Sequence, residues 1–484
     1  MATDWLNAPD YTIARLLIGR GLAAIYFIAF VVALRQFPAL LGERGLLPVP
    51  AFTRGLGFWQ APSLFLLRYS DGLLRAVAWI GIGLSSALLL GVGDLVPLPI
   101  GMAAWFVLWA LYLSIVNVGQ SFYSFGWESL LLEAGFLGIF LGNDEVVPPT
   151  LVILLFRWLA FRVEFGAGLI KLRGDPCWRD LTCLDYHHET QPMPNPLSWY
   201  AHHLPRRFHR FEVLGNHVAQ LVVPFGLFLP QPFAAIAGGY MILTQMYLVV
   251  TGNYAWLNWI TIVIAIAALP DSVLGNVLPW TSTGLAASAP WFGVTVVLLA
   301  VVVAGLSYWP VRNLMGRRQM MNYSFNTLHL VNTYGAFGSV TRSRDEVVIE
   351  GTTDEEPDAG STWQEYEFRG KPGDPRRLPP QVAPYHLRLD WLMWFLPLSP
   401  VYGEAWFVRF LGRLLVNDPL VLGLVRMNPF PHRPPTVVRA RLYRYRFSTW
   451  RERRASGAWW VRELDGEYFP ALRLQPSGDI GRAW

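Results

Sequence analysis

A series of long apolar runs dominates the first two thirds of this 484-residue sequence. The runs lie near residues 13–34, 73–93, 98–117, 124–142, 150–171, 217–250, 255–269 and 291–309. Most approach the length of about 20 residues that an α-helix needs to cross the hydrocarbon core of a bilayer. We therefore predict an α-helical polytopic membrane protein. It has eight or nine transmembrane helices, depending on whether residues 217–250, which three prolines interrupt, form one helix or two.

Charge separates the two parts of the chain. Residues 1–309 contain 15 Lys or Arg and 16 Asp or Glu, whereas the shorter stretch 310–484 contains 24 and 18. A stretch so poor in charge and so apolar is typical of a membrane domain, and the tail is typical of a mildly basic, water-facing domain. We therefore predict a transmembrane domain over 1–309 and a separate C-terminal domain over 310–484. Neither contains a motif for binding nucleic acid or phosphate.

Short segments of the tail have the alternation that is typical of β-strands. They lie at residues 346–352, 363–369 and 437–447, and in the last of these Tyr443, Tyr445 and Phe447 alternate onto one face. Residues 390–398 are apolar and are predicted to be helical, but they are too short to cross a membrane. The C-terminal domain is therefore predicted to be β-rich.

The fifth apolar run contains three charged residues at intervals of seven. Arg157, Glu164 and Lys171 are each almost two full helical turns apart, so they project from one face of the helix. A charge at the membrane centre costs roughly 2.5–3.5 kcal/mol on insertion scales. We therefore expect these groups to pair with one another around a polar pocket inside the membrane.

Lys171 is unusual because the chain contains 37 arginines and only two lysines. An ammonium group can lose its proton when it is desolvated, whereas a guanidinium group effectively cannot. Lys171 is therefore a candidate general base or covalent group, with Glu164 as the partner that sets its protonation. The alternative is a structural ion network that holds the helices together, and the sequence leaves both interpretations open.

Two further carboxylates, Glu128 and Glu133, lie in the fourth run. Because they are five residues apart, they do not share a helical face closely. One is expected to line the pocket, and the other to pack against Arg157 or Arg162. Structural pairing is the favoured role for both.

Residues 172–216 form a polar segment between the fifth and sixth runs, rich in Trp, Tyr, His and Pro. This composition predicts an ordered cap rather than a linker. The only two cysteines of the chain, Cys177 and Cys183, lie here, and we predict that they form a disulfide if this side is oxidising. A redox-active or free thiol pair is the alternative, although the spacing is not Cys-x-x-Cys.

Six of the nine histidines also lie in or beside this cap segment, within 31 residues. Adjacent histidine pairs such as His187 and His188 do not match the spacing of zinc ligands, even with Asp185 and Glu189 nearby. We therefore expect these histidines to form hydrogen bonds inside an aromatic cap. No metal site and no cofactor are predicted.

Four long motifs resemble the lipase maturation factor family. They are FRVEFGAGLIKLRGDPCWRDLTCLDYHHETQPMPNPLSWYAHHLP, RFHRFEVLGNHVAQLVVPF, NYSFNTLHLVNTYGAFGSVTRSRDEVVIEGT and PYHLRLDWLMWF. The resemblance implies a multi-span protein of the endoplasmic reticulum membrane that assists the folding and assembly of secreted lipases into active dimers. It also implies that the conserved domain faces the lumen. The arginine-rich composition suggests a bacterial member, whose location would be the cytoplasmic (inner) membrane.

The orientation of the cap stays open at this point. If the crossings alternate, the loop 35–72, the cap segment and the C-terminal domain share one side, which carries nearly all the loop arginines. The positive-inside rule places that side in the cytoplasm, opposite to the lumenal side that the resemblance implies.

A shorter element, FGAGLIKL, is followed by an acidic residue and Trp. It is similar to the AG-x-x-KL element of the vitamin K-dependent carboxylase and related membrane proteins. In those proteins the matching lysine is the catalytic base, so this similarity would put Lys171 at the active position. It covers about a dozen residues.

Two hypotheses about function follow. The leading hypothesis is a membrane-bound maturation factor whose partners are secreted client proteins such as lipases, together with membrane lipids. The rival is a membrane enzyme that modifies a lipid or peptide with Lys171 as base and Glu164 beside it. For the first hypothesis, the C-terminal domain packs on the cap segment, and the predicted client-binding residues are Trp178, Asp185, Tyr186, His187, His188, Trp199, Asn326 and Trp363.

Overall fold

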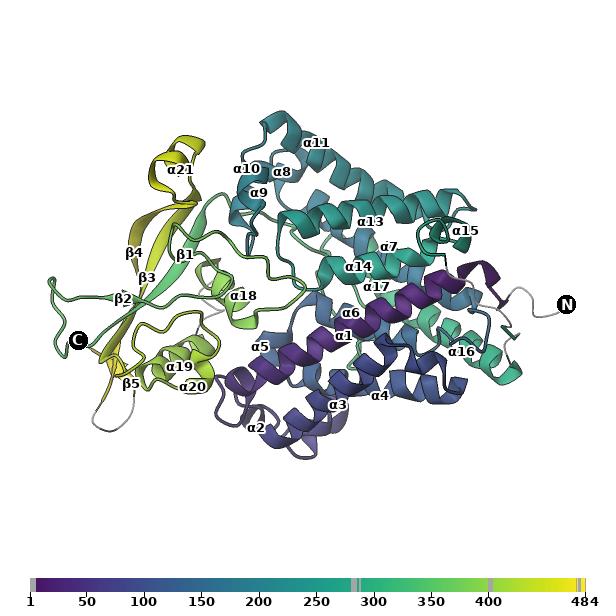
Figure 1. Cartoon of the computed structure of the whole chain (residues 1–484), viewed down its shortest axis with the longest axis horizontal. Helices are drawn as coiled ribbons and strands as arrows, with labels where there is room; N and C mark the ends of the chain where they lie inside the picture. Colours follow the sequence, from purple (N-terminus) through teal and green to yellow (C-terminus); the bar gives the residue numbers. More distant parts are fainter. Residues whose placement is uncertain are drawn as a thin grey trace.

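The computed structural model describes residues 6–279, 285–286, 289–398, 404–475, 477 and 480–483. Long helices pack side by side in one part of the molecule, and a five-stranded sheet lies at the opposite end (Figure 1). Helix α1 (Thr12–Leu41) begins far from the sheet and ends near the C-terminal part. There the side chain of Gln36 donates to the backbone oxygen of His386 (2.6 Å) and accepts from the backbone N–H of Arg388 (3.0 Å).

Five helices among the described residues are long and apolar enough to cross a membrane. They are α1, α3 (Asp71–Leu89), α4 (Leu98–Asn117), α13 (Phe233–Thr251) and α16 (Pro290–Leu306), which α17 (Tyr308–Met315) continues. The chain is therefore a mostly helical protein with five candidate membrane spans. The larger number of eight or nine stays a prediction.

The remaining apolar runs form helices that are shorter or more highly charged. Helix α6 (Gly126–Gly138) has 13 residues, and α14 (Leu257–Ala265) continues into a 3-10 turn, η7 (Ile266–Ala268). Helix α7 (Thr150–Arg173) has 24 residues, but it carries the charged groups singled out above. These segments are helical, but α6 and α14 are too short and α7 is too highly charged to be counted as candidate membrane spans.

The run 217–250 divides into two helical segments. The first comprises α11 (Arg206–His217), the π-helical turn η6 (Val218–Val222) and α12 (Val223–Gly226). The chain then breaks before α13, in a stretch that contains Pro230 and Pro232. Proline lacks the amide hydrogen that a helix interior requires, which explains the position of the break.

The cap segment, residues 172–216, is built from short helices. They are α8 (Pro176–Arg179), α9 (Leu184–Thr190) and α10 (Ser198–His202), and they lead into α11. The predicted disulfide between Cys177 and Cys183 is confirmed, with 4.8 Å between the two Cα atoms. It closes the turn that connects α8 to α9.

The C-terminal sheet is antiparallel throughout, with strand order β2-β1-β3-β4-β5. The strands are β1 (Arg344–Thr352), β2 (Gln364–Glu365), β3 (Val437–Phe447), β4 (Trp460–Leu474) and β5 (Ile480–Arg482). Predicted strands 346–352 and 437–447 correspond to β1 and β3. The predicted strand 363–369 is wrong in length, because only its second and third residues pair with β1.

Shorter helices complete the fold. They are α2 (Val49–Phe52), α5 (Gln120–Tyr123), α15 (Asp271–Leu274), α18 (Arg388–Phe395), α19 (Glu404–Leu415), α20 (Pro419–Leu422) and α21 (Trp450–Ser456). Helix α18 matches the short apolar helix predicted near residues 390–398. It continues into the 3-10 turn η8 (Leu396–Leu398).

The sheet packs directly on the cap segment. Trp199 of α10 lies in a cluster with Val348, Tyr445, Phe447 and Trp460 of the sheet. Its indole N–H donates to the backbone oxygen that follows β3, at Ser448 (2.9 Å). Burial of large aromatic rings supplies most of the free energy of such a junction. The junction therefore fixes the position of the sheet relative to the cap segment.

Candidate functional site

The amine of Lys171 lies near the end of α7, beneath the cap segment. Its Nζ donates to the side-chain oxygens of Asn216 (3.1 Å) and Gln220 (2.9 Å). The same atom lies 4.8 Å from the centre of the Trp178 ring, which adds a cation–π contact. The buried ammonium is thus held by neutral groups.

Glu164 lies almost two helical turns before Lys171 on α7, and amide side chains also surround it. Gln220 donates to one carboxylate oxygen (3.1 Å), and Gln245 of α13 donates to the other (2.7 Å). Gln245 in turn accepts from Asn258 of α14 (2.7 Å). Gln220 therefore bridges Lys171 and Glu164, accepting from the amine and donating to the carboxylate. The two charged groups share one polar network through this amide.

The bridging residue lies in the π-helical turn η6. A π-turn inserts an extra residue into a helix, and such turns are frequent at functional sites. Asn216 and Gln220 both point toward α7, and they also contact each other (3.2 Å). The widened turn thus brings two amides to the amine of Lys171, an arrangement that seven-residue spacing on α7 could not reveal.

Arg157 does not join this network, which corrects the expectation of one shared pocket for all three α7 charges. Its guanidinium donates to the backbone oxygens of Ala267 (2.9 Å) and Leu227 (3.2 Å) and to the hydroxyl of Tyr11 (2.7 Å). The physical reason is distance along the helix. Fourteen residues correspond to a rise of about 21 Å, which is beyond the reach of side chains on one face.

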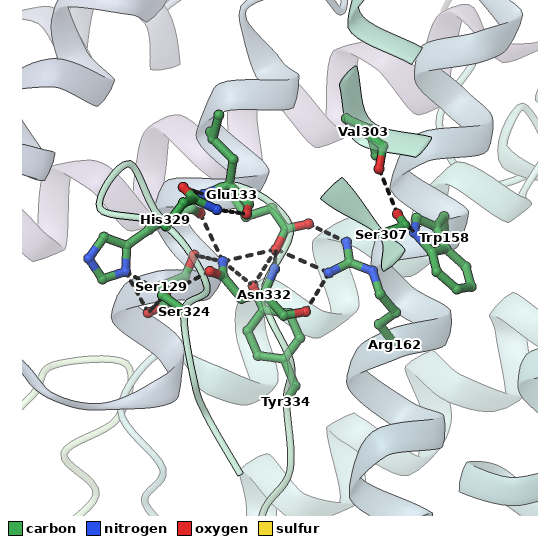
Figure 2. Close-up of polar contacts among 12 residues, drawn as sticks. Ser129, Glu133, Trp158, Arg162, Val303, Ser307, Ser324, His329, Asn332 and Tyr334 are labelled. Atoms are coloured by element: carbon green, nitrogen blue, oxygen red, sulfur yellow. Dashed lines mark hydrogen bonds and ion pairs between the residues drawn. The ribbon is translucent and has the colours of Figure 1, made fainter. Parts of the chain in front are cut away.

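Arg162 and Glu133 form a direct ion pair that ties α7 to α6. Figure 2 shows the two side chains pointing toward each other, with Asn332 and Tyr334 beside them. The Tyr334 hydroxyl (2.7 Å) and the Asn332 backbone N–H (2.8 Å) both donate to the Glu133 carboxylate. Arg162 also donates to the Asn332 backbone oxygen (2.6 Å). Asn332 and Tyr334, which follow the last membrane helix in the sequence, therefore complete this buried network.

Glu128 belongs to a third network, which lies between α6 and the C-terminal part. Arg388 of α18 forms an ion pair with its carboxylate (2.8 Å), and the Tyr112 hydroxyl donates to it. The Arg388 guanidinium lies 3.4 Å from the centre of the Tyr123 ring. Glu128 therefore does not line the Lys171 pocket, which corrects that alternative. The positive charge that pairs with Glu128 belongs to Arg388, and this partner was not predicted from the sequence.

Two of the three tryptophans predicted to bind a client are buried in the cap segment. Trp178 is 3% exposed and donates to the backbone oxygen of Phe337 (2.9 Å), and Trp199 is 1% exposed in the junction with the sheet. A client cannot contact these rings without opening the fold. Their apolar area is used in folding, so their role in client binding stays a prediction that requires this part of the fold to open.

The other predicted client-binding residues lie at several places. The His187 ring contacts the Tyr254 hydroxyl (2.8 Å), so this residue is also internal. The Tyr186 ring is half-buried beneath Arg342 (5.0 Å). Trp363 is half-buried and stacks with the Arg439 guanidinium (3.6 Å). These residues therefore do not form one continuous surface.

Asn326, the remaining predicted tail residue, has a local structural role. Its side chain accepts from the backbone N–H groups of Leu328 (3.2 Å) and Leu330 (3.0 Å), and it donates to the backbone oxygen of Leu330 (2.8 Å). Such contacts are typical of an asparagine that stabilises a turn. Asp185 and His188 lie on α9 and are considered below.

The residues that surround Lys171 and Glu164 were missed in the sequence. Asn216, Gln220, Gln245 and Asn258 are neutral amides within or next to apolar runs. A neutral polar side chain at membrane depth needs a partner, so these positions carried a usable signal. The sequence-based prediction of the pocket used only charged residues. The amides that contact Lys171 and Glu164, directly or through one another, lie on α11 with η6, on α13 and on α14.

Comparison with known proteins identifies relatives over nearly the whole chain. The family model described as lipase maturation factor transmembrane domain matches residues 13–276, and the lipase maturation factor C-terminal domain matches residues 330–470. Lipase maturation factor 1 of Bos taurus is 45% identical over 97% of this chain and 91% of its own length. The human protein of that name is 44% identical (97% and 89%). Lipase maturation factor 2 of Xenopus laevis is 31% identical (96% and 83%). No solved structure matches the chain significantly.

Proposed function

The chain belongs to the lipase maturation factor family, and from this premise we propose that it assists the folding and assembly of secreted lipases as a membrane-bound factor. The observation that carries the proposal is the 45% identity to a lipase maturation factor 1 along nearly all of both chains. Both the helical part and the sheet part are included in that match. The proposal therefore concerns the whole chain rather than one domain.

The buried charges support a scaffold role. Glu133 is held by Arg162 and by residues of the tail, and Glu128 is held by Arg388. Each network connects a helix of the membrane part to a segment that lies far away in sequence. Buried ion pairs of this kind fix the relative positions of the parts they join. A rigid platform that holds the cap segment and the sheet together is what a folding factor can offer a client.

We propose that clients dock on an aromatic patch, which we define as Tyr200 of the cap segment, Trp450 of the neighbouring helix α21 and the half-buried Trp459 between α21 and β4. Tyr200 is 46% exposed and Trp450 is 49% exposed, and their ring centres lie 6.0 Å apart. Trp459 lies 6.2 Å from Tyr200. Exposed aromatic clusters of this kind favour contact with the apolar surface of an incompletely folded protein. The patch replaces the buried Trp178 and Trp199 as the proposed contact.

The test is co-expression with a secreted lipase in cells that lack a maturation factor of their own. We expect the lipase activity per mass of secreted lipase to rise when the chain is present, because folding, not synthesis, is improved. Double substitution of Tyr200 and Trp450 by Ser should reduce this gain. The melting temperature of the variant is measured alongside, because both rings also contact the buried Trp199. An unchanged specific activity with the wild-type chain correctly inserted in the membrane would contradict the proposal.

The location that we propose is the membrane across which the client lipases are secreted. This is the endoplasmic reticulum membrane in a eukaryotic cell and the cytoplasmic membrane in a bacterium. Further crossings would come from α6, from α7, from the continuous segment α11–η6–α12 and from α14 with η7. We propose that the cap segment and the domain 310–484 face the oxidising side, where a disulfide such as Cys177–Cys183 persists. Protease protection of the sheet in sealed vesicles tests this orientation, and cleavage from the cytoplasmic side would contradict it.

A membrane enzyme with Lys171 as its base is not favoured by the comparisons. The matched relatives carry the name of maturation factors over both of their domains. The contacts of Lys171 also have a structural explanation, because two amide oxygens and an aromatic ring satisfy the buried amine.

A further inference from the structure

Three potential metal ligands meet where α9 packs on α11. They are His188 of α9 and the residues His209 and Glu212 of α11, and one ligand atom from each lies within 4.8 Å of the other two. His209 and Glu212 are three residues apart, so they project from the same face of α11 toward α9. His188 is the second member of an adjacent histidine pair, 21 residues earlier in the chain than His209. The fold therefore assembles a cluster that linear spacing did not predict.

The His188 side chain lacks the partners that its burial requires. It is 3% exposed, and neither ring nitrogen has a hydrogen-bond partner among the described residues. Its Nε2 lies 3.6 Å from a carboxylate oxygen of Glu212, which is longer than a normal hydrogen bond. An unsatisfied polar group in the interior lowers the stability of the fold. A purely structural role for His188 leaves this cost uncompensated.

Glu212 is oriented as a ligand would need to be. The His209 Nδ1 atom lies 2.7 Å from its second oxygen, and the Tyr247 hydroxyl donates to its first. The carboxylate, a common ligand of divalent ions, therefore faces two imidazole rings at once.

We propose that His188, His209 and Glu212 bind one divalent transition-metal ion, with Zn²⁺ as the expected ion. Two imidazoles and one carboxylate form a ligand set that suits zinc, and they leave a fourth position open. The ion links α9 to α11 and so fastens the cap segment next to the disulfide. This inference goes beyond the lipase-directed function, and it revises the prediction of a metal-free cap.

The test measures the metal directly, in full-length protein purified in detergent. We expect elemental analysis to find close to one zinc ion per chain. After treatment with a chelator, the same protein should regain one Zn²⁺, and its melting temperature should rise when the ion returns, because a ligand that binds only the folded state stabilises it. Titration with Co²⁺ should give the visible absorption that is typical of a low-symmetry nitrogen and oxygen site.

Single substitutions identify the ligands. His188→Gln and Glu212→Gln should each weaken Zn²⁺ binding at least about tenfold, since even the loss of a partner outside the ligand set costs that much. His203→Gln is the matched control, because His203 lies in the same cap segment and contacts the backbone oxygen of Trp199 instead. Its Zn²⁺ affinity should equal that of the wild type.

Two results would overturn the proposal. One is a folded wild-type chain that holds only traces of zinc and takes up none on titration, a measurement that does not depend on any variant folding. The other is equal Zn²⁺ affinity for the wild type and His188→Gln. Neither result bears on lipase maturation, so failure of the metal site and failure of the proposed function remain distinguishable.

Discussion

The only two lysines of the chain occupy different kinds of buried site. Lys171, in the helical part, is 5% exposed and donates to the amide oxygens of Asn216 and Gln220. Lys371, beside the sheet, is 2% exposed, and its Nζ lies 2.6 Å from a carboxylate oxygen of Glu346. One amine therefore meets neutral groups, and the other is paired directly with a negative charge.

The comparison changes how the rarity of lysine is interpreted. In a chain that otherwise uses arginine, lysine suggested a group selected for its ability to lose a proton. Lys371 has the same rarity, yet it lies in a salt bridge in the C-terminal domain. Both sites are tightly enclosed, and an ammonium group is more compact than a guanidinium group. Both lysines of this chain therefore occupy small buried sites. The two sites differ in the partner of the amine, which is a carboxylate for Lys371 and a pair of amides for Lys171.

The largest expected effect comes from removing the carboxylate that pairs with Lys371. Glu346 also forms an ion pair with Arg344 (2.7 Å), so Glu346→Gln removes the directly paired carboxylate from two buried cations. Breaking a buried pair on one side costs about 3–5 kcal/mol. We expect a loss of that size in the free energy of unfolding, measured by denaturant unfolding of the purified protein.

Glu164→Gln is the matched substitution in the helical part. Gln220 and Gln245 contact Glu164 through neutral amides, and an amide can replace the carboxylate in part of these contacts. The loss of stability should therefore be clearly smaller than for Glu346→Gln. Equal losses would mean that the contrast between the two lysine sites has no energetic basis.

Local patterns were sufficient to predict much of the fold. The alternation of Tyr443, Tyr445 and Phe447 gave the bounds of β3, and the cysteine spacing gave the disulfide. Strand β4 was missed, although it is the longest strand among the described residues. It contains Gly466, Pro470 and several charged residues, which are unfavourable in an isolated strand, so pairing with β3 must supply its stability.

The partners of the buried charges could not be predicted, because they are distant in sequence. Glu128 meets Arg388 across 260 residues, and Glu133 meets Asn332 across 199. The periodicity of one helix shows which side chains face inward, but it does not show what faces them. The charges of α7 were expected to pair with one another, whereas the contacts in the structure come from other segments of the chain.

An intermediate effect is expected from pH. Burial, only partly opposed by Glu346, lowers the pKa of Lys371 to about 8. An unfolded lysine has a pKa of about 10.4, so between these values the unfolded chain holds a proton that the folded chain has released. Stability therefore rises with pH at about 1.4 kcal/mol per unit above pH 8, and this contribution is lost as the pH falls through 8.

Unfolding measured between pH 8 and pH 9.5 should show this contribution as about 2 kcal/mol. Because other groups also titrate in this range, the relevant quantity is the difference between wild type and Lys371→Met, in which the lysine contribution is absent. Parallel pH profiles for the two proteins would show that Lys371 stays protonated in the fold, and its site would then resemble an ordinary ion pair.

The smallest effect is expected at Lys171 itself. Met has nearly the same length and is uncharged, so Lys171→Met removes the cost of burying a charge together with the hydrogen bonds that offset it. Gln220 keeps a donor, because Asn216 contacts its oxygen (3.2 Å). We expect a loss of about 1 kcal/mol in stability, well below that for Glu346→Gln, because the groups that lose a donor are neutral amides and not a directly paired carboxylate.

The same variant separates a scaffold from an enzyme. If Lys171 only fills a buried site, Lys171→Met should give a specific activity of the secreted lipase near the wild-type value, whereas Lys171→Arg should do worse because a larger group overpacks the site. If Lys171 abstracts a proton, both variants should fall to the level of cells without the chain. That second outcome, with unchanged melting temperatures, would show that the two lysines differ in chemistry and not merely in their partners.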